Sequence, residues 1–354
     1  MSSQPSKKIT IHEVAARAGV SLMTVSRVLR NEPYVAQATR AAVQQAIAAL
    51  NYVPLQSARN LSSSVAKVLG LVVPHTAVDV PHKTGYEYLS ALYLGAMQIC
   101  NRHGYGLMLV HAESGAAAQD LVRRAGARQV GGYVLAAPVS EHAGLLATLR
   151  ERDIAHASIS PLEAEPGGLW AAADERVAAR EMALHIAAQG LHAIAYVGSG
   201  RAIRAGRERL AGHKEALKQL GLRSRREWTV SAGLSFEAGL AAGRKLLALQ
   251  WIPDAVQCET DELAAGVIAA AHELGMRLPN DLSVVGFDDF GLAHKVWPAL
   301  TTAQLPVEEM AAHAASQVIG ALEGRRVENR LFTCAVQFRQ SVAMMPAAGR
   351  PDAD

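Results

Sequence analysis

The segment SLMTVSR, residues 21–27, holds a closely spaced set of side chains with a recognisable chemistry. If the segment is helical, Arg27 shares one exposed face with Ser26, Leu22 and Met23. A guanidinium can donate two parallel hydrogen bonds to O6 and N7 of a guanine, and an aliphatic side chain can contact the methyl group of a thymine. This face therefore offers the chemistry needed to read base edges in duplex DNA.

Two short helices joined by a glycine must position this face. Thr10 followed by Glu13 is a capping box and predicts a helix start. Gly19 permits the positive φ of a tight turn, and the hydroxyl of Ser21 can cap the next helix. Apolar residues recur at helical spacing on the inner faces of both helices, at Ile11, Val14, Ala15, Ala18, Val25, Val28 and Leu29. The pattern predicts a helix-turn-helix arrangement whose second helix enters the major groove.

Two further features favour this interpretation over an ordinary pair of helices. A third amphipathic helix follows, with Val43, Ala46, Ile47 and Leu50 on one face. Residues 1–66 contain seven Lys or Arg and two Glu, while the whole chain carries a net charge of +3, so the remainder is slightly acidic. A basic N-terminal head on a slightly acidic body favours contact between the head and the phosphates of a nucleic acid.

Residues 54–67 join this head to the rest of the chain. Pro54 stops the third helix at or before Val53, and the segment LQSARNL is long enough for barely two helical turns. So short a helix is unstable alone in water. Two interpretations stay open. The segment is either a solvated linker, or it folds only against DNA or a partner chain and leaves Leu61 as an exposed apolar wedge.

Beyond residue 67, apolar runs alternate with amphipathic stretches, as in VLGLVVP, YLSALYLGAMQICNRHG and GLMLVHA. This alternation predicts βαβ units and a parallel sheet with helices on both faces. The chain has 354 residues, which is too long for one such sheet and a head, so two α/β subdomains are expected. Ligands of open α/β sheets bind beyond the carboxyl ends of the strands. That rule selects residues 197–200, 259–261 and 287–289 as candidate cleft positions.

The chain resembles the LacI/GalR family of bacterial transcription regulators over essentially its full length. The similarity lies in the order and spacing of ITIHEVAARAGVSLMTVSRVL, ATRAAVQQAIAALNYVP, SARNL, RERLAG (207–212), LSVVGFDDF (282–290) and WPALTT (297–302). The resemblance implies a helix-turn-helix head on a two-lobed body like that of a periplasmic binding protein. It also implies a repressor that binds a pseudo-palindromic operator as a homodimer and is controlled by a small effector, commonly a sugar or sugar derivative.

The resemblance assigns DNA contacts to individual residues. Leu22, Met23 and Arg27 correspond to positions that contact base edges, and Leu61 to a leucine that relatives insert into the minor groove, where it would bend the duplex. The full predicted set is Thr10, Ser21, Leu22, Met23, Thr24, Ser26, Arg27, Ala58 and Leu61. Ala36 departs from the family pattern, because it stands where a serine usually caps the third helix.

The resemblance also assigns effector contacts. Asp288 and Arg209 correspond to an acid and an arginine that bind the effector, and Asp174, Thr260 and Asp261 to more variable cleft positions. The full predicted set is Asp174, Arg204, Arg209, Thr260, Asp261 and Asp288. Plain alternatives remain, because two adjacent acids after a strand can cap the next helix and a helix arginine can simply face solvent.

The stretch GSGRAIRAGRERLAG is dense in arginine, with Arg201, Arg204, Arg207 and Arg209. Guanidinium groups suit carboxylate, phosphate and vicinal hydroxyls, so we expect an anionic or polyhydroxylated effector, with a solvated helix face as the alternative. Leu234 stands where several relatives stack a ring on the effector. A ring would have to come from Trp228, Phe236 or Trp297, each of which could equally belong to the core.

Two other classes of function are disfavoured. An enzyme is not expected, because the thirteen histidines are scattered, no HExxH or paired cysteine motif occurs, and the GSG at 198–200 completes neither a dinucleotide-binding turn nor a nucleophile elbow. We therefore expect no metal and no cofactor. A free periplasmic sugar-binding protein would need a secretory signal, which MSSQPSKKIT does not provide, and would leave the basic head unexplained.

The remaining expectations concern compartment, assembly and boundaries. Three widely spaced cysteines do not form a disulfide framework, and no apolar run is long enough to cross a membrane, so a cytoplasmic protein is expected. A dimer is expected through body helices near residues 89–99 and 263–274. The predicted parts are the head (1–53), a hinge helix and linker (54–67), the two-subdomain body (68–345) and a tail (346–354).

Overall fold

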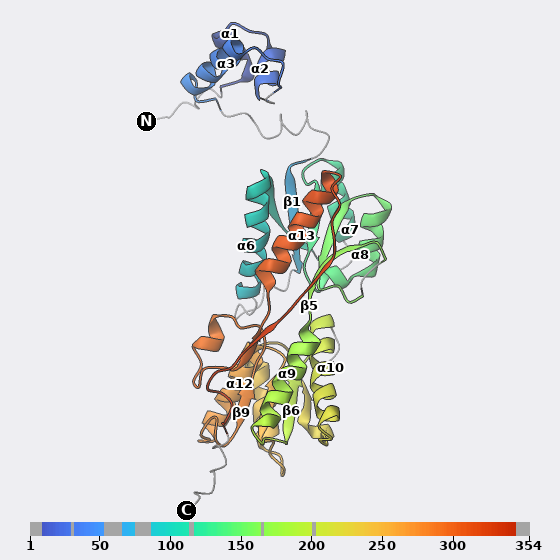
Figure 1. Cartoon of the computed structure of the whole chain (residues 1–354), viewed down its shortest axis with the longest axis vertical. Coiled ribbons are helices and arrows are strands. Elements are labelled where there is room, and N and C mark those ends of the chain that lie inside the picture. The colour runs from blue at the N-terminus through green and yellow to red at the C-terminus, as the bar shows by residue number, and fades with distance from the viewer. Residues whose placement is uncertain are drawn as a thin grey trace, which may run out of the picture. The chain divides into compact units, whose positions relative to one another are not determined.

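The computed structural model describes residues 9–29, 32–52, 66–74, 86–112, 117–163, 166–199 and 203–344. The chain divides into two compact units, residues 1–66 and 67–354 (Figure 1). Ala58, Leu61, Arg201 and the predicted tail lie outside the described residues, so the expectations placed on them stay predictions.

The first unit contains three helices: α1 (Ile11–Ala18), α2 (Leu22–Leu29) and α3 (Gln37–Ala49). Gly19 ends α1 with a φ of 64°, as the glycine turn requires. The inner faces of the helices share one small core, made of Val14, Ala15, Val25, Val28, Val43 and Ala46. Ala36 precedes α3 without a side-chain cap. The predicted three-helix arrangement is therefore confirmed.

The second unit has two lobes, each built on one parallel sheet, as the alternation of strands and helices predicted. The sheet of the N-terminal lobe contains, in spatial order, β11 (Arg330–Phe332), β5 (Leu169–Ala173), β4 (Ala155–Ile159), β3 (Gly132–Leu135), β1 (Val68–Pro74) and β2 (Gly106–Ala112). On one face α6 (Tyr86–His103) and α13 (Val307–Leu322) lie side by side (Figure 1). Helices α7 (Ala117–Gly126) and α8 (Ala143–Glu151) belong to the other face, and a 3₁₀ turn, η1 (Val139–Glu141), precedes α8.

The C-terminal lobe contains, in spatial order, strands β7 (Thr229–Ser231), β6 (Ile194–Gly198), β8 (Ala255–Cys258) and β9 (Ser283–Val285). Helices α9 (Glu175–Ala188) and α10 (Arg204–Gln219) cover one face of the sheet. Helices α11 (Phe236–Leu247) and α12 (Asp261–Glu273) cover the other. Two short 3₁₀ turns, η2 (Arg226–Trp228) and η3 (Gly291–His294), complete the lobe.

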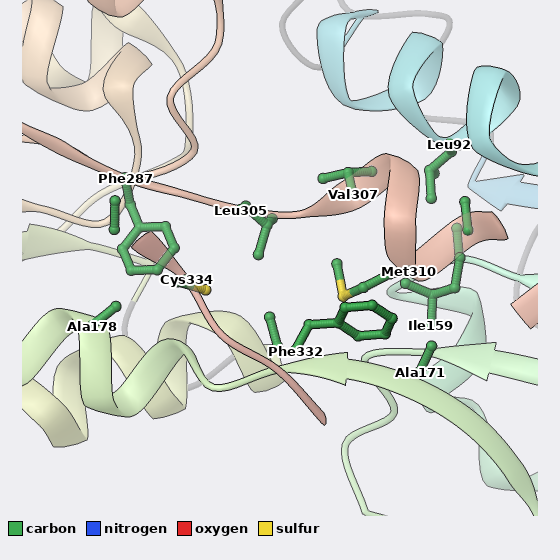
Figure 2. Packing of buried hydrophobic residues seen from close by; sticks show 14 of the residues in the cluster. Leu92, Ile159, Ala171, Ala178, Phe287, Leu305, Val307, Met310, Phe332 and Cys334 are labelled. Atoms are coloured by element: carbon green, nitrogen blue, oxygen red, sulfur yellow. The ribbon is translucent and has the colours of Figure 1, made fainter. Parts of the chain in front are cut away.

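Three chain segments among the described residues connect the lobes: β5 to α9, the antiparallel strand β10 (Thr302–Gln304) to α13, and β11 to β12 (Ala335–Gln337). One hydrophobic cluster continues through these crossings. Figure 2 shows Leu305 between Phe287, from the C-terminal lobe, and Val307 and Met310 of α13. The two lobes therefore share a core at their junction.

One sequence prediction is wrong. Residues 263–274 were expected to supply a dimer surface, but most of the apolar side chains of α12 are buried inside the lobe. The reason is close packing, since Gly239 and Gly266 leave no room for a Cβ between α11 and α12.

None of the helices in the described part of the chain is long and apolar enough to cross a bilayer. Cys100, Cys258 and Cys334 are buried and unpaired, as expected for a chain without a disulfide framework.

Candidate functional site

The exposed face of α2 is positioned by the caps and core of the head. The backbone N–H of Thr10 donates to Oε2 of Glu13 at 2.6 Å, which fixes the start of α1. The hydroxyl of Ser21 accepts from the backbone N–H of Thr24 at 3.2 Å, so Ser21 caps α2 as predicted. Because Val25 and Val28 point into the core, Leu22 and Met23 project outward, with exposed fractions of 39% and 61%.

Arg27 lies on this helix beside an exposed aromatic ring. Its guanidinium carbon is 5.7 Å from the ring centroid of Tyr34, which is itself 67% exposed. Ser26 is partly exposed on the same helix. The side chains predicted to read bases thus lie on a surface that the head does not use for its own packing.

A cavity of about 760 Å³ lies between the two lobes of the body. Residues from both lobes line it, so any change in lobe closure must change its shape. Tyr88, Glu141 and Ser160 come from the N-terminal lobe. Arg209, Leu234, Glu259, Thr260, Asp261 and Asp288 come from the C-terminal lobe, and Glu175 begins α9 just after a crossing.

Arg209 is at the centre of the buried charges in this cavity. Its Nε donates to Oε2 of Glu175 at 2.8 Å, and its Nη1 donates to Oδ1 of Asp288 at 3.1 Å and to the backbone carbonyl of Glu259. Its guanidinium also lies 3.8 Å from the ring centroid of Phe287. Glu175 and Arg209 are both at least nine-tenths buried. The arginine is therefore held by protein groups on several sides.

The two aspartates that follow β9 do not cap the next helix. Phe290 precedes η3 without a side-chain cap, while the carboxylate of Asp289 accepts from Nη2 of Arg339 at 2.6 Å. Asp288 and Asp289 have φ values of 113° and 56°, in the region that favours glycine. This backbone directs Asp288 toward Arg209, and it is the kind of strain that clusters at functional sites.

Asp261 connects this loop to a crossing segment. Its carboxylate accepts from the hydroxyl of Thr302 at 2.6 Å and from the backbone N–H of Asp289 at 2.8 Å. Burial, with a smaller contribution from nearby Asp288, raises the pKa of Asp261 to about 8. Burial also raises the pKa of Asp288 to about 7, although Arg209 opposes that rise.

Glu259 and Thr260 are occupied by local contacts in the cavity wall. The carboxylate of Glu259 accepts from both the backbone N–H and the hydroxyl of Ser199, at 2.7 and 2.6 Å. The hydroxyl of Thr260 accepts from the backbone N–H of Leu263 at 3.2 Å and caps α12. Both residues line the cavity, and both also hold their own elements in place.

Asp174 and Arg204 are not among the described residues that line the cavity. The carboxylate of Asp174 caps α9 by accepting from the backbone N–H of Val177 at 3.3 Å. Arg204 points instead toward the crossing after β5, where its Nη1 is 3.4 Å from the carbonyl of Ala173 and 3.6 Å from Oε1 of Glu175. Asp174 and Arg204 therefore hold α9 and the crossing segment in place and do not themselves line the described cavity.

Several lining residues carry no signal in the sequence. Glu175 and Glu141 belong to no motif, although Glu175 directly follows Asp174, one of the predicted effector-binding residues. The aromatic lining comes from Tyr86, Tyr88 and Phe290. None of the three rings named as candidates is part of the described lining: Trp228 is buried and donates to the carbonyl of Trp251 at 3.0 Å, while Phe236 and Trp297 are exposed elsewhere.

Comparison with known proteins agrees with this arrangement. Residues 10–55 match the family described as bacterial regulatory proteins, lacI family, and residues 183–342 match a periplasmic binding protein-like domain. The HTH-type transcriptional repressor PurR of Pectobacterium carotovorum subsp. carotovorum (strain PC1) is 32% identical over 325 residues, which cover 90% of this chain and 91% of that protein. The chain belongs to the LacI family of bacterial regulatory proteins.

Other relatives of this LacI-family regulator share its full architecture. PurR of Vibrio vulnificus (strain CMCP6) is 29% identical over 91% of the chain and 95% of that protein. The structure of the transcriptional regulator CelR–cellobiose complex matches with 26% identity and a TM-score of 0.70, covering 94% of this chain and 99% of that one. The Lac repressor dimer bound to operator and the anti-inducer ONPF, at 22% identity, has the same fold, with a TM-score of 0.81 over 95% of this chain and 99% of that one.

The two PurR relatives are named as transcriptional repressors. The regulator is accordingly a DNA-binding transcriptional repressor of the LacI family and not an enzyme, as its sequence predicted. Its relatives support operator DNA and a small-molecule effector as its partners.

Proposed function

We propose that this regulator binds a pseudo-palindromic operator as a homodimer and that a sugar or sugar derivative in the inter-lobe cavity controls that binding. The observation that carries the proposal is the cavity itself, since both lobes line it. A ligand there binds differently to open and closed lobes, and this difference in affinity is what shifts a conformational equilibrium.

The exposed face of α2 is the proposed reader of the operator. Arg27 supplies the donors for a guanine, while Leu22 and Met23 read shape and thymine methyl groups. Ser21, Thr24 and Ser26 lie on or next to this helix, where they can contact phosphates or neighbouring bases. Leu61 keeps its proposed place as the minor-groove wedge.

The dimer is supported by two observations. A two-fold operator needs a two-fold protein, and one relative is described as a dimer bound to operator. Tyr93 and Leu94 of α6 are 37% and 55% exposed, so part of the expected apolar surface at residues 89–99 is available to a second copy.

The sugar effector is supported by the lining and by one relative. The cavity volume is in the usual range for small-molecule sites. Carboxylates can accept hydrogen bonds from hydroxyl groups, and the rings of Tyr88 and Phe290 offer apolar faces. The relative CelR is described as a complex with cellobiose.

A selection from random duplex DNA tests the proposal. The purified regulator should enrich a sequence with two-fold symmetry, and its affinity for that operator should change when a panel of mono- and disaccharides is added. Asp288→Asn should abolish the response to the active sugar while operator binding persists. The control Asp281→Asn, at an exposed pair with Arg277, should leave the response intact. Enrichment of no sequence would refute the operator, and a response unaffected by Asp288→Asn would refute the site.

A further inference from the structure

The lining of the cavity is strongly acidic. Among the described residues that line it, seven are Asp or Glu and two are Lys or Arg. One of the two cations, Lys295, lines the cavity but is exposed, so water screens its charge. The other is Arg209, which is 4% exposed.

Arg209 is not free to receive an anion. Glu175 and Asp288 accept from its Nε and Nη1, at 2.8 and 3.1 Å, and the Phe287 ring covers the guanidinium at 3.8 Å. An anionic ligand would have to displace a buried carboxylate, which would then be left without a partner. Leaving a buried charge unpaired is strongly unfavourable.

Arg204 and Arg207, the other described arginines of this stretch, are also directed to protein groups. The Nη2 of Arg207 donates to the carbonyl of Leu162 at 2.7 Å, so this side chain is directed to a loop of the other lobe. Arg204 is directed toward Ala173 and Glu175. The arginine density of this stretch, which favoured an anionic or polyhydroxylated effector, therefore gives no support to the anionic half of that expectation within the described residues.

The amino end of α10 is also occupied. A helix N-terminus is a natural anion site, because its first backbone N–H groups have no partner within the helix. Here Oε1 of Glu141, from the opposite lobe, accepts from the backbone N–H of Arg204 at 3.0 Å. A carboxylate of the protein thus fills the place that a ligand carboxylate or phosphate would take.

The remaining acids are satisfied only in part. Glu259 is bound by Ser199, and Asp261 by Thr302 and the backbone of Asp289. These hydrogen-bond partners are neutral groups, so Arg209 is the one buried cation beside the acids among the described lining residues. Burial raises the pKa values of Glu141, Asp261 and Asp288, as expected where carboxylates exceed the cations that can neutralise them.

We infer that the effector of this regulator carries a positive charge, and that it is an amine-bearing sugar or polyol. An ammonium group would compensate the excess carboxylates at Glu141, Glu175 and Asp288. The aromatic rings of Tyr86, Tyr88 and Phe290 suit such a ligand, since a cation is attracted to a ring face. The inference rests on the proposed effector site and specifies which class of sugar that site takes.

Matched ligands that differ only in charge test the inference. Titration calorimetry would compare glucosamine, galactosamine and mannosamine with their N-acetyl derivatives, the parent hexoses and the hexuronates, using the full-length protein in a neutral buffer, where most of the amine is protonated and Asp288 is partly ionised. At least one hexosamine should bind at least about tenfold more tightly than its hexose and N-acetyl partners, and the matched hexuronate should be the weakest. Added salt should weaken the hexosamine most.

Two variants separate a charge effect from a folding defect. Glu141→Gln removes one lining carboxylate and should lower the ratio of hexosamine affinity to parent-hexose affinity. Glu273→Gln, in an exposed pair with Arg244, should leave the preference unchanged. A hexose or hexuronate that binds more tightly than the matched hexosamine would overturn the inference but leave the sugar site in place. If no member of the panel binds, both the inference and the sugar site fall, while operator selection remains an independent measure of the DNA function.

Discussion

Arg209 and Glu175 meet at 2.8 Å, from Nε to Oε2, although they come from different helices and both are almost completely buried. Glu175 begins α9 directly after a crossing between the lobes, and Arg209 lies in the second turn of α10. The contact therefore attaches a crossing segment to the wall of the cavity. It makes the stability of the body depend on the same charges that line the inter-lobe cavity.

Removal of Arg209 should destabilise the body. Arg209→Met keeps much of the side-chain volume but leaves Glu175 and Asp288 without their cation, and breaking a buried ion pair costs about 3–5 kcal/mol. Thermal unfolding should show a clear decrease in the Tm of the body. The matched variant Arg244→Met breaks an exposed pair with Glu273 and should hardly change the Tm. Equal decreases for both variants would contradict the structural role of Arg209.

The stability of the body should fall as the pH rises from about 6.5 to 8. Burial raises the pKa of Asp261 to about 8 and that of Asp288 to about 7, above the ordinary value of 3.8, so the folded state holds protons that the unfolded state has lost. Stability from such groups is present at low pH and is lost as the pH rises through the folded-state pKa.

Below pH 6.5 the titration of His213 also changes the stability of the body, so the effect of the aspartates is best measured above that pH. Burial lowers the pKa of His213 from 6.5 to about 4, so its contribution is present above pH 6.5 and is lost as the pH falls toward 4. Measurements of Tm against pH should therefore isolate the aspartates above pH 6.5. Asp261→Asn should flatten the slope there, and an unchanged slope would exclude Asp261 as its source.

The contact between α11 and α12 should not tolerate a methyl group. A Cβ at Gly266 would overlap the backbone carbonyl of Phe236, so Gly266→Ala must push the two helices apart and should lower the Tm. Gly126, at the end of α7, has nothing within 4 Å of its Cβ position. Gly126→Ala should therefore be neutral, or stabilise by about 0.4–1 kcal/mol through the unfolded chain. A neutral result for Gly266→Ala would show that α12 can move away from α11.

Arg27 should determine the base preference at one base pair in each half of the operator. Arg27→Ala should reduce discrimination there by about 1–3 kcal/mol, measured by fluorescence anisotropy with operators substituted at single positions. Arg17→Ala removes the same charge from α1 and should leave the base preferences intact. If the two variants lose affinity uniformly across all sequences, Arg27 contacts the phosphate backbone and not a base.

The head could be predicted from the sequence because its signals are local. The Thr10–Glu13 box, Gly19 and Ser21 act within a few residues of themselves, and the apolar spacing fixes which side of α2 is buried. The alternation of strands and helices likewise determined two α/β lobes. The rule that ligands bind beyond strand ends selected Glu259, Asp261 and Asp288, which all line the cavity.

The tertiary structure decided what these local signals could not. Whether α12 is a surface or a core helix depends on the approach of α11, whose Phe236 lies thirty residues before Gly266 in the chain. Whether Arg209 can meet an anion depends on Glu175 and Asp288, and whether the end of α10 is open depends on Glu141 of the other lobe. The sequence thus determined which residues carry charge. The folded chain determined which charges are already paired, because an electrostatic interaction depends on distance and burial and not on separation along the chain.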